Sequence, residues 1–540
     1  MIKKIIKYLR LILYQYQYIQ FNKKIFINNN SNLKKNKILV EFYHYDPSII
    51  SFAVFANILS KKFDANIYGY TIGKKTYLKK IFYNFYHFSY WKIYQSFGVK
   101  KIFHLNNKYY DKKYFNFISK KLKTSKNILN LKIKNIPIGD LVYDEYLRVN
   151  NVAFIDTKDP KFLIFLKDVI TAFFFWDAKL DGSVKSLIIS HSVYLIGLPA
   201  RIAIYKNIPV YNIAVNSVYF LSKKNITKFT GFDSYPLIFQ KMKNNFHKNI
   251  LHKTSKIILN KFLGKLDLAQ ITTPLISGSS IKSNDISKVF DKKLSKKKLI
   301  LDENKTNILI ASHCFTDAVH AHGKFIFLNF YEWFEFLINY SLKKKNYIWY
   351  VKMHPADFDR NKEILDSLLS KYENFVILPK DINHNEIISA KIDVVLSVNG
   401  SVGYEYPFVN IPVINASSNG PHQAYKFNYH AKSKKDYINL LDIIPKIKNK
   451  ILSKHTKLKI SEYYFVKFMT QYHFLNNLNN IMIKLKKNYN SPMIYNEYIK
   501  QFKQNEFLIQ NEEIKKFILS KKNRIYADNT KKRSKAVLFY

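Results

Sequence analysis

Two groups of polar residues in the second half of the chain have the types and spacing of a site for a phosphate-bearing ligand. They are Lys352, His354 and Pro355, and, later in the chain, Asn399, Gly400 and Ser401. Histidine and lysine can donate to a phosphate oxygen, and a glycine lets the backbone approach a ligand closely. Backbone amides at the start of a helix also favour an anion. We therefore expect these residues to bind the phosphate of a nucleotide, with His354 offsetting charge as the nucleotide leaves.

Neighbouring side chains could complete such a site. Glu405 stands one helical turn after Ser401, and a carboxylate suits the vicinal hydroxyls of a ribose. Lys352 is two residues before His354, so on a strand both side chains point to the same side. The alternatives are structural roles: His354 as a buried, hydrogen-bonded histidine, Ser401 as a helix cap and Glu405 as a surface acid.

The residues around these groups predict parallel sheets. Short β-branched runs alternate with longer amphipathic stretches, which is typical of βα units. Ligands of such sheets bind at the carboxyl ends of the strands, and each polar group falls just after a run. The runs that fit strands are 37–42, 65–70, 101–105, 187–190, 208–212, 307–311, 348–351, 374–379, 393–398 and 411–415.

Two further loops carry residues with chemical potential, and we expect them to bind an acceptor hydroxyl or a phosphate. Their candidate residues are His191 and Ser192, and His313 and Asp317. The loop 312–323 contains three histidines and an aspartate, which could also suggest a metal. The spacing matches no zinc site, and there is no EF-hand or HExxH pattern, so we expect no metal. A lone histidine at a strand end, such as His191, is as readily a structural hydrogen-bonding residue.

The overall charge is strongly positive. The 540 residues include 88 lysines and arginines against 38 aspartates and glutamates, a formal net charge of +50. Binding to a polyanion is one explanation. The other, which we favour because the charge is spread along the chain, is a bias of the whole sequence towards Lys, Asn, Ile, Tyr and Phe. The hydrophobic content of 47% excludes a disordered chain. The single cysteine, Cys314, excludes a disulfide framework and fits a reducing cytoplasm.

The two ends of the chain carry basic segments. The N-terminus lacks the long apolar stretch and cleavage site of a secretory signal, and no apolar run is long enough to span a bilayer. Apolar residues share one face of a helix over the first 13 residues and basic residues another, which predicts either a membrane-surface helix or a helix packed on the protein. The C-terminal tail contains the basic run Lys531, Lys532 and Arg533, and we interpret it as mobile or membrane-facing.

At His354-Pro355 and Asn399-Gly400-Ser401 the chain resembles GT-B glycosyltransferases of bacterial capsule and surface-polysaccharide synthesis. Among these are CMP-sugar-dependent β-Kdo transferases and, more distantly, bacterial sialyltransferases and CDP-glycerol glycerophosphotransferases. These families carry a strand followed by His-Pro, and then a small hydroxyl-bearing turn that opens a helix with a Glu shortly after. The run Ile-Pro-Val-Ile at 411–414 strengthens the match. The resemblance covers 305–420 firmly and 37–220 loosely.

The resemblance implies an α/β fold of the GT-B type. Two Rossmann-like domains with parallel sheets would face a central cleft, followed by a helical C-terminal extension. The expected segments are an N-terminal amphipathic and basic segment (1–36), an acceptor domain (37–230), a linker region (231–305), a nucleotide-sugar-binding domain (306–450), and C-terminal helices with a basic tail (451–540).

The resemblance also implies a glycosyltransferase. It would move a sugar from a nucleotide-sugar donor, a CMP-activated acidic sugar such as Kdo, to a polysaccharide or lipid-linked acceptor. The donor is a substrate, and no cofactor is expected. The protein would be cytoplasmic, and an anionic membrane surface at the inner membrane is a further partner that the N-terminal helix allows.

Transfer to a hydroxyl needs a base, and the logic of the family places it in the first domain. The candidates are Glu41, Asp46, Asp140, Asp144 and His191. We favour Asp46, which lies in the loop expected after the first strand, as the catalytic residue that acts together with His354.

Other functions stay open. The loop 312–323 departs from the glycerophosphotransferase pattern, so a CDP-alditol phosphotransferase-like polymerase is the second interpretation. A non-catalytic protein that binds membrane or nucleic acid, or a degenerate scaffold, is the third. The aromatic residues fall mainly in apolar periodic stretches rather than in a basic patch, so we expect no nucleic-acid partner.

Overall fold

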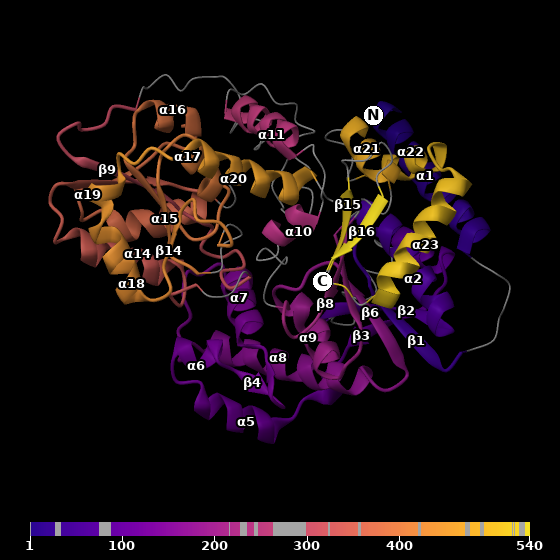
Figure 1. Cartoon of the computed structure of the whole chain (residues 1–540). Helices are drawn as coiled ribbons and strands as arrows, with labels where there is room; N and C mark the ends of the chain where they lie inside the picture. The colour runs from indigo at the N-terminus through magenta and orange to yellow at the C-terminus, as the bar shows by residue number, and fades with distance from the viewer. Residues whose placement is uncertain are drawn as a thin grey trace.

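A computed structural model places most of the chain in two α/β domains, with helices from both ends of the chain side by side (Figure 1). The described residues are 2–26, 34–74, 88–214, 217–226, 235–241, 247–262, 299–321, 325–354, 358–418, 423–469, 476–485, 491–520, 522, 524–528 and 535–539. Pro355, His322 and the basic tail residues 531–533 lie outside them.

The first domain is built on an eight-stranded sheet with the order β16-β15-β8-β7-β6-β1-β2-β3. The strands from β3 to β7 are parallel, whereas β8, β15 and β16 pair antiparallel. The strands are β1 (Asn36–Glu41), β2 (Ala65–Lys74), β3 (Val99–Leu105), β6 (Val184–Ile189), β7 (Val210–Ala214), β8 (Ser217–Leu221), β15 (Arg524–Asp528) and β16 (Lys535–Phe539). The chain builds outward from β1 to β3 and then outward on the other side from β6. The switch point of this Rossmann-like sheet therefore lies between β1 and β6.

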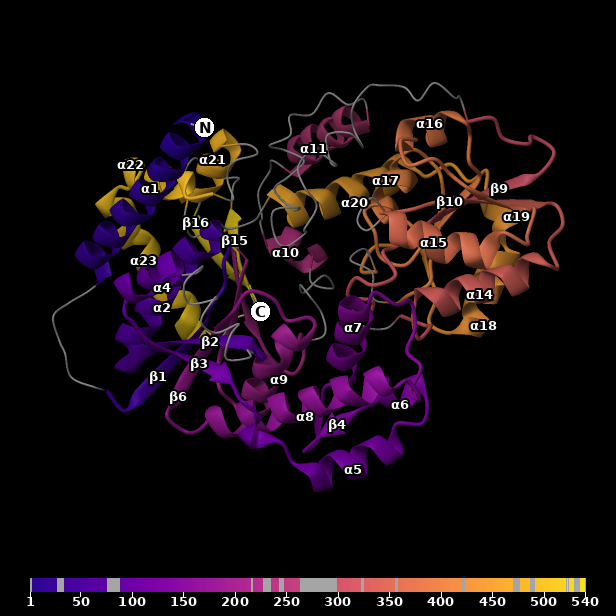
Figure 2. The same cartoon turned by 180° about the vertical axis from the view of Figure 1, so that it is seen from behind.

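Helices connect these strands. They are α2 (Asp46–Phe63), α4 (Phe88–Ser96), α5 (Lys112–Lys121), α6 (Ser125–Leu129), α7 (Gly139–Asn150), α8 (Pro160–Lys179) and α9 (Leu198–Tyr205), with the short 3-10 helices η1 (Asn107–Tyr109) and η2 (Leu195–Gly197) and the small hairpin β4 (Lys132–Ile133) and β5 (Ile136–Pro137). Figures 1 and 2 show α7 on the side of this domain that faces the second domain.

The second domain has a six-stranded sheet with the order β11-β10-β9-β12-β13-β14, in which every pair is parallel. Its strands are β9 (Thr306–Ala311), β10 (Tyr347–Lys352), β11 (Phe375–Ile377), β12 (Val394–Ser397), β13 (Val413–Asn415) and β14 (Tyr429–His430). Its helices are α14 (Phe330–Ser341), α15 (Phe358–Leu369), α16 (His384–Ser389), α17 (Val402–Phe408), α18 (Lys434–Asp442) and α19 (Ile444–Ile447). This is the Rossmann strand order, with its switch point between β9 and β12.

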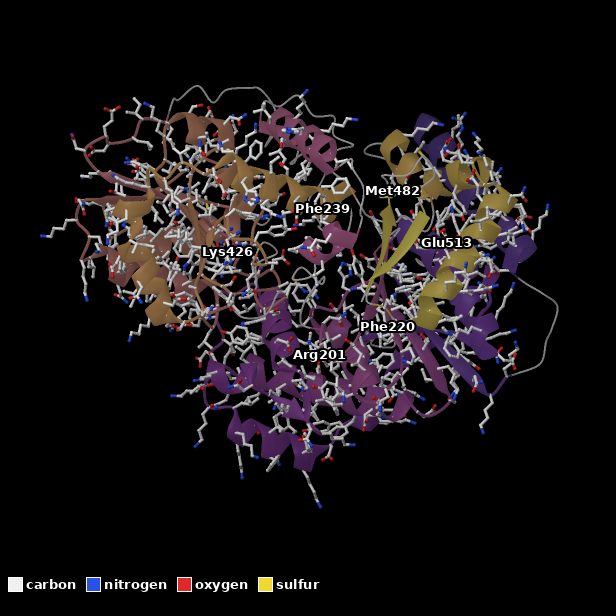
Figure 3. All side chains as sticks on the ribbon, viewed as in Figure 1. Arg201, Phe220, Phe239, Lys426, Met482 and Glu513 are labelled. Carbon is white, nitrogen blue, oxygen red and sulfur yellow. The ribbon has the colours of Figure 1, made fainter. Side chains whose placement is uncertain are left out.

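The remaining helices come from the two ends of the chain and from the segment between the two domains in the sequence. They are α1 (Ile2–Phe26), α10 (Tyr235–Lys241), α11 (His247–Phe262), α20 (Lys454–Tyr464), the π-helix η4 (Phe465–Met469), α21 (Asn476–Leu485), α22 (Met493–Lys500) and α23 (Gln504–Ser520). Two of these helices, α10 and α11, lie in the region 231–305. They pack with Tyr404 of the second domain and with Tyr463 of α20. The last helices return to the first domain, where the ring of Tyr495 stacks on Tyr18 of α1 at 4.3 Å. Figure 3 shows Met482 of α21 and Glu513 of α23 on that side.

The expected fold class is confirmed by the strand orders: two Rossmann-like α/β domains of the GT-B type. One local expectation was wrong. Asp46 does not lie in a loop after the first strand, because α2 begins at this residue, where an acid and Pro47 both suit a first helical turn. In addition to the expected C-terminal helices, the end of the chain supplies β15 and β16 to the first sheet.

Within the described part of the chain, no helix combines the length and the apolar character needed to cross a bilayer.

Gly139, at the start of α7, has no room for a side chain. A Cβ on Gly139 would lie 2.1 Å from the carbonyl oxygen of Leu129 and 2.3 Å from that of Ile128, and backbone atoms cannot move aside cheaply. We expect Gly139→Ala to cost about 1–3 kcal/mol and to lower the melting temperature by several degrees. The matched control is Gly182→Ala, whose Cβ would meet nothing within 4 Å. Equal shifts in the two variants would contradict this account.

Candidate active site where the two domains meet

The switch point of the second sheet brings two of the predicted residues together. His313 follows β9 and Asn399 follows β12, and the Asn399 backbone N–H donates a long hydrogen bond of 3.5 Å to His313 Nε2. The His313 ring stacks on Phe330 of α14 with centroids 5.0 Å apart. Nucleotides bind Rossmann-like sheets at this position.

Two buried hydroxyl groups at the same edge escaped the sequence analysis. Ser312 directly follows β9 and is 6% exposed, and Ser397 ends β12 and is 1% exposed. Neither Oγ has a hydrogen-bond partner among the described residues. Burying a hydroxyl without a partner costs about 1–3 kcal/mol, so both groups can gain from a polar ligand. The signal was a serine at the end of each apolar run, one residue before His313 and two residues before Asn399.

The Gly400 turn lies against Ser397 and His313 and could accommodate a Cβ. A Cβ on Gly400 would make only ordinary contacts of 3.5–3.9 Å, with Ser397 Oγ and His313 among them, so the packing of the protein does not require a glycine here. Ser401 is exposed, and its Oγ donates to Glu405 Oε2 at 3.2 Å instead of capping α17. The expected contacts of these residues with a nucleotide stay predictions.

His354 and Lys352 at the end of β10 have different surroundings. Lys352 Nζ donates to the Ile382 carbonyl at 2.7 Å, and burial lowers the pKa of Lys352 to about 8. Burial also lowers the pKa of His354. The negative charge of Asp317 raises this pKa, and the positive charge of Lys352 lowers it further. His354 is therefore neutral at pH 7, with one ring N–H to donate.

The first sheet places three polar residues at its own switch point. Ser190 N donates to Glu41 Oε2 at 2.6 Å, Ser190 Oγ donates to Glu41 Oε1 at 2.9 Å, and His191 Nδ1 lies 2.9 Å from the same Oγ. Burial raises the pKa of Glu41 to about 7, against the two hydrogen bonds from Ser190. Burial lowers the pKa of His191; the charge of Arg148 adds to this and Asp317 opposes it. The imidazole is therefore neutral at pH 7.

Asp317 of the second domain reaches the first domain. Its carboxylate accepts a hydrogen bond from the Tyr194 hydroxyl, and the guanidinium of Arg148 lies 4.4 Å from the Tyr194 ring centroid. Tyr194 has a positive φ of 55°, a strained backbone for a non-glycine residue. Asp317 acts electrostatically on both His191 and His354. The carboxylate of Asp317 therefore acts on one predicted histidine from each domain, His191 and His354.

A buried pair holds the loop that carries Asp317. The backbone N–H of His320 donates to Asp144 Oδ2 at 3.0 Å, and its ring Nδ1 lies 2.6 Å from Asp144 Oδ1. His320 Nε2 lies 3.0 Å from the Leu328 carbonyl, so both ring nitrogens are used. Asp144 of α7 is thus engaged in joining the domains.

Two predicted residues lie apart from this group. Asp46 is 2% exposed, and its carboxylate accepts from the hydroxyl of Tyr495 at 2.8 Å and is also hydrogen-bonded by Tyr90. Burial raises the pKa of Asp46 to about 6. Ser192 is buried, and its carbonyl packs so closely on Gly197 that a Cβ there would lie 2.4 Å from it.

Among the described residues, no three His, Cys, Asp or Glu side chains are grouped in a way that could hold a metal ion. Of the histidines in the loop 312–323, His313 and His320 have separate partners on different elements.

Comparisons with known proteins identify similar folds. No protein-family model and no curated protein matches the chain. The UDP-GlcNAc 2-epimerase from Neisseria meningitidis bound to UDP-GlcNAc is similar at 12% identity over 80% of this chain and 99% of that chain, with a TM-score of 0.25. A glycosyltransferase from Rickettsia africae is 12% identical over 90% and 99%, with a TM-score of 0.22. The wall teichoic acid polymerase TagF is 11% identical over 93% and 97%, with a TM-score of 0.19. These are enzymes of the GT-B fold, and no narrower family is indicated; the fold assignment rests on the two strand orders.

The raised pKa of Glu41 predicts a pH dependence of stability. A carboxyl whose pKa rises on folding stabilises the native state fully below its unfolded value of 4.5, and this contribution is lost as the pH rises through about 7. The shift corresponds to about 3 kcal/mol. We expect wild type to lose about that much unfolding free energy relative to Glu41→Gln between pH 4.5 and pH 7.5, measured by urea denaturation. Parallel pH curves for the two proteins would contradict a buried Glu41 that titrates near neutrality.

Proposed function

We propose that the chain is a nucleotide-sugar-dependent glycosyltransferase, in which the second domain binds the donor nucleotide and the first domain the acceptor. The observation that carries this proposal is the meeting of two switch points. Asp317, from the loop after β9, contacts Tyr194 in the loop after β6. A group bound at one sheet edge would thereby lie next to a group bound at the other.

The second domain supplies the donor side. The hydroxyls of Ser312 and Ser397 have no partner among the described residues and are suited to phosphate or ribose oxygens. His313 and His354 follow β9 and β10 and can each donate a ring N–H to a leaving phosphate. The Gly400 turn lies beside two of these residues, since a Cβ on Gly400 would come within 3.6 Å of Ser397 Oγ and 3.9 Å of the His313 ring.

The finer identity of the substrates follows from the resemblance of the ordered motifs. We take the donor to be a CMP-activated acidic sugar such as Kdo, and the acceptor to be a surface polysaccharide or a lipid-linked precursor. The net charge of +50 favours anionic substrates of this kind.

A nucleotide panel tests the donor site. CMP, CDP, UMP, UDP and GDP are added in a thermal-shift assay, where a ligand that binds only the native state raises the melting temperature. We expect CMP to give the largest rise, and His354→Ala and His313→Ala to abolish it. His455→Ala is the matched control, because His455 is an exposed histidine of α20. Preference for UDP or GDP would overturn the CMP assignment, and no response to any nucleotide would overturn the proposed function.

The buried hydroxyl of Ser397 allows a sharper variant. Ser397→Ala removes an unpartnered polar atom, so we expect the unliganded protein to keep or gain stability. The same change should reduce the shift produced by the nucleotide, since the ligand loses a donor. A fall in stability without ligand, or an unchanged nucleotide shift, would contradict this role of Ser397.

We also propose that α1 attaches the enzyme to an anionic membrane. Tyr18, 1% exposed, faces the core, whereas Leu9, Leu13 and Tyr16 are 58%, 49% and 57% exposed on the opposite face of the helix. Arg10 is exposed beside this apolar face. An apolar face with flanking positive charge is suited to the interface of anionic lipids. This would hold the site near a lipid-linked acceptor.

Vesicles test this attachment. We expect wild type to co-sediment with vesicles that contain phosphatidylglycerol but not with vesicles of phosphatidylcholine alone, and the double variant Leu9→Glu/Leu13→Glu to lose this binding. Ile164→Glu is the control, because Ile164 is an equally apolar residue of α8 that is 66% exposed. Equal binding of the double variant and the control would exclude this face as the attachment site.

A further inference from the structure

We infer that Glu41, Ser190 and His191 form a hydrogen-bonded relay that makes Nε2 of His191 the general base for the acceptor hydroxyl. This inference rests on the proposed function and names the base for that reaction. His191 would be the catalytic residue, and Glu41 and Ser190 would position it.

The hydrogen count of the relay determines the tautomer of His191. The single hydroxyl hydrogen of Ser190 is donated to Glu41 Oε1 at 2.9 Å when that carboxylate is ionised. The 2.9 Å contact between Ser190 Oγ and His191 Nδ1 then requires the ring nitrogen to be the donor. In a neutral imidazole, a hydrogen on Nδ1 leaves the lone pair on Nε2. A base therefore exists before any substrate binds.

The backbone holds this relay at the place where ligands bind to such sheets. β1 and β6 are neighbours in parallel register, with Val40 opposite Ile188. Glu41 is the last residue of β1, and Ser190 is the first after β6, so both strand ends meet at the switch point. The backbone N–H of Ser190 also donates to Glu41 Oε2 at 2.6 Å, which fixes the carboxylate independently of the hydroxyl.

The groups around His191 keep it neutral and give its protonated form a partner. Arg148 of α7 and burial both disfavour the imidazolium, whereas Asp317 of the second domain favours it. The ring of Tyr43, which follows β1, meets the His191 ring edge-on with centroids 6.1 Å apart. Tyr194 is occupied by its hydrogen bond to Asp317. The imidazole of His191 is therefore neutral before the reaction, and the negative charge of Asp317 stabilises it after it takes a proton.

Sugar transfer with this relay forms one bond, breaks another and moves one proton. The acceptor oxygen forms a bond to the anomeric carbon of the sugar while the bond from that carbon to the phosphate oxygen breaks. The proton of the acceptor hydroxyl passes to His191 Nε2, and the bonding electron pair leaves with the nucleotide phosphate. The proton on Nδ1 stays hydrogen-bonded to Ser190. His191 returns its extra proton to solvent before the next turnover.

The other acids in the first domain are less suited to this role. Asp144 is held by both the ring and the backbone of His320. Asp46 is 2% exposed and is hydrogen-bonded by Tyr495 of α22. Both carboxylates therefore already serve packing contacts between segments far apart in the sequence.

Replacement of Glu41 by glutamine should reverse the relay without changing its shape. The backbone N–H of Ser190 requires the amide oxygen of the new side chain as its acceptor, which turns the amide nitrogen towards Ser190 Oγ. The Ser190 hydroxyl must then donate to His191 Nδ1, and the ring hydrogen moves to Nε2. Protonation of Glu41 has the same effect, so the base form should grow as the pH rises through neutrality.

The first experiment reads the tautomer and needs no substrate. Two-bond 1H–15N spectra of protein labelled with 15N-histidine report which ring nitrogen carries the hydrogen, and His191→Gln assigns the signal. We expect the Nδ1–H form at pH 8 in wild type and the Nε2–H form in Glu41→Gln. The control Ser186→Ala should match wild type, because the hydroxyl of that β6 serine donates to the Pro209 carbonyl. An Nε2–H form in wild type, or the same tautomer in Glu41→Gln, would overturn the relay.

The second experiment measures transfer with the sugar donor of the nucleotide selected by the thermal-shift panel. We expect His191→Ala and Glu41→Gln to lower kcat by roughly 100-fold or more, with donor KM and the nucleotide thermal shift unchanged. Wild-type kcat/KM should rise through about pH 7, as Glu41 ionises, and this rise should vanish in Glu41→Gln.

The outcomes separate the relay from the proposed function. A predicted tautomer without any transfer activity would support the relay and overturn the glycosyltransferase. Transfer that survives in His191→Ala but is lost in Asp46→Asn would overturn His191 as the base and restore Asp46. Transfer that falls equally in Ser186→Ala and Ser190→Ala would show a structural effect of the strand and contradict a positioning role for Ser190.

Discussion

The buried contact between Asp144 and His320 is the constraint on which the candidate site depends. One carboxylate binds both the backbone and the ring of the same residue, at 3.0 and 2.6 Å, and the two residues belong to different domains. Breaking a buried pair of this kind costs about 3–5 kcal/mol, because the remaining partner stays buried without compensation. The pair holds the loop after β9 against α7, and that loop carries Asp317 to Tyr194 of the first domain.

The element that bears this contact is itself firmly anchored. Arg201 of α9 is 1% exposed and donates to both carboxylate oxygens of Asp140 in the first turn of α7, at 2.8 and 3.1 Å. Figure 3 labels Arg201 in the first domain, below the second domain. One turn along α7, the Tyr143 hydroxyl accepts from Asn329 of the second domain at 2.8 Å. Since α7 is fixed at one end and contacts the other domain at the next turn, it sets the relative position of the two switch points.

Both sheets use their switch points in the same way, with a hydroxyl between a strand end and a histidine. In the second sheet, Ser312 precedes His313. The hydroxyl of Ser312 has no partner among the described residues, so it could bond a ligand. In the first sheet, Ser190 precedes His191 and its hydroxyl is bonded to Glu41, which suits a base. The same Ser-His order after a parallel strand is thus compatible with a binding role on one side and proton transfer on the other. One difference between them is the carboxylate of Glu41, which bonds the hydroxyl of Ser190 from the neighbouring strand end.

Local patterns in the chain were enough to predict most strands and their parallel βα arrangement, because apolar periodicity and polar strand ends are properties of neighbouring residues. The resemblance to a known fold added the division into two Rossmann-like domains, and the roles of His191, His313, Asp317 and His354 stay predictions. The partner of each side chain was beyond such patterns. Glu41 meets Ser190 across 149 positions, and Asp46 looked like a loop carboxylate until Tyr495, from the other end of the chain, covered it. Sequence neighbours set which residues stand at a strand end, whereas the order of the strands and the returning helices set which carboxylate bonds Tyr495 and which one bonds Ser190.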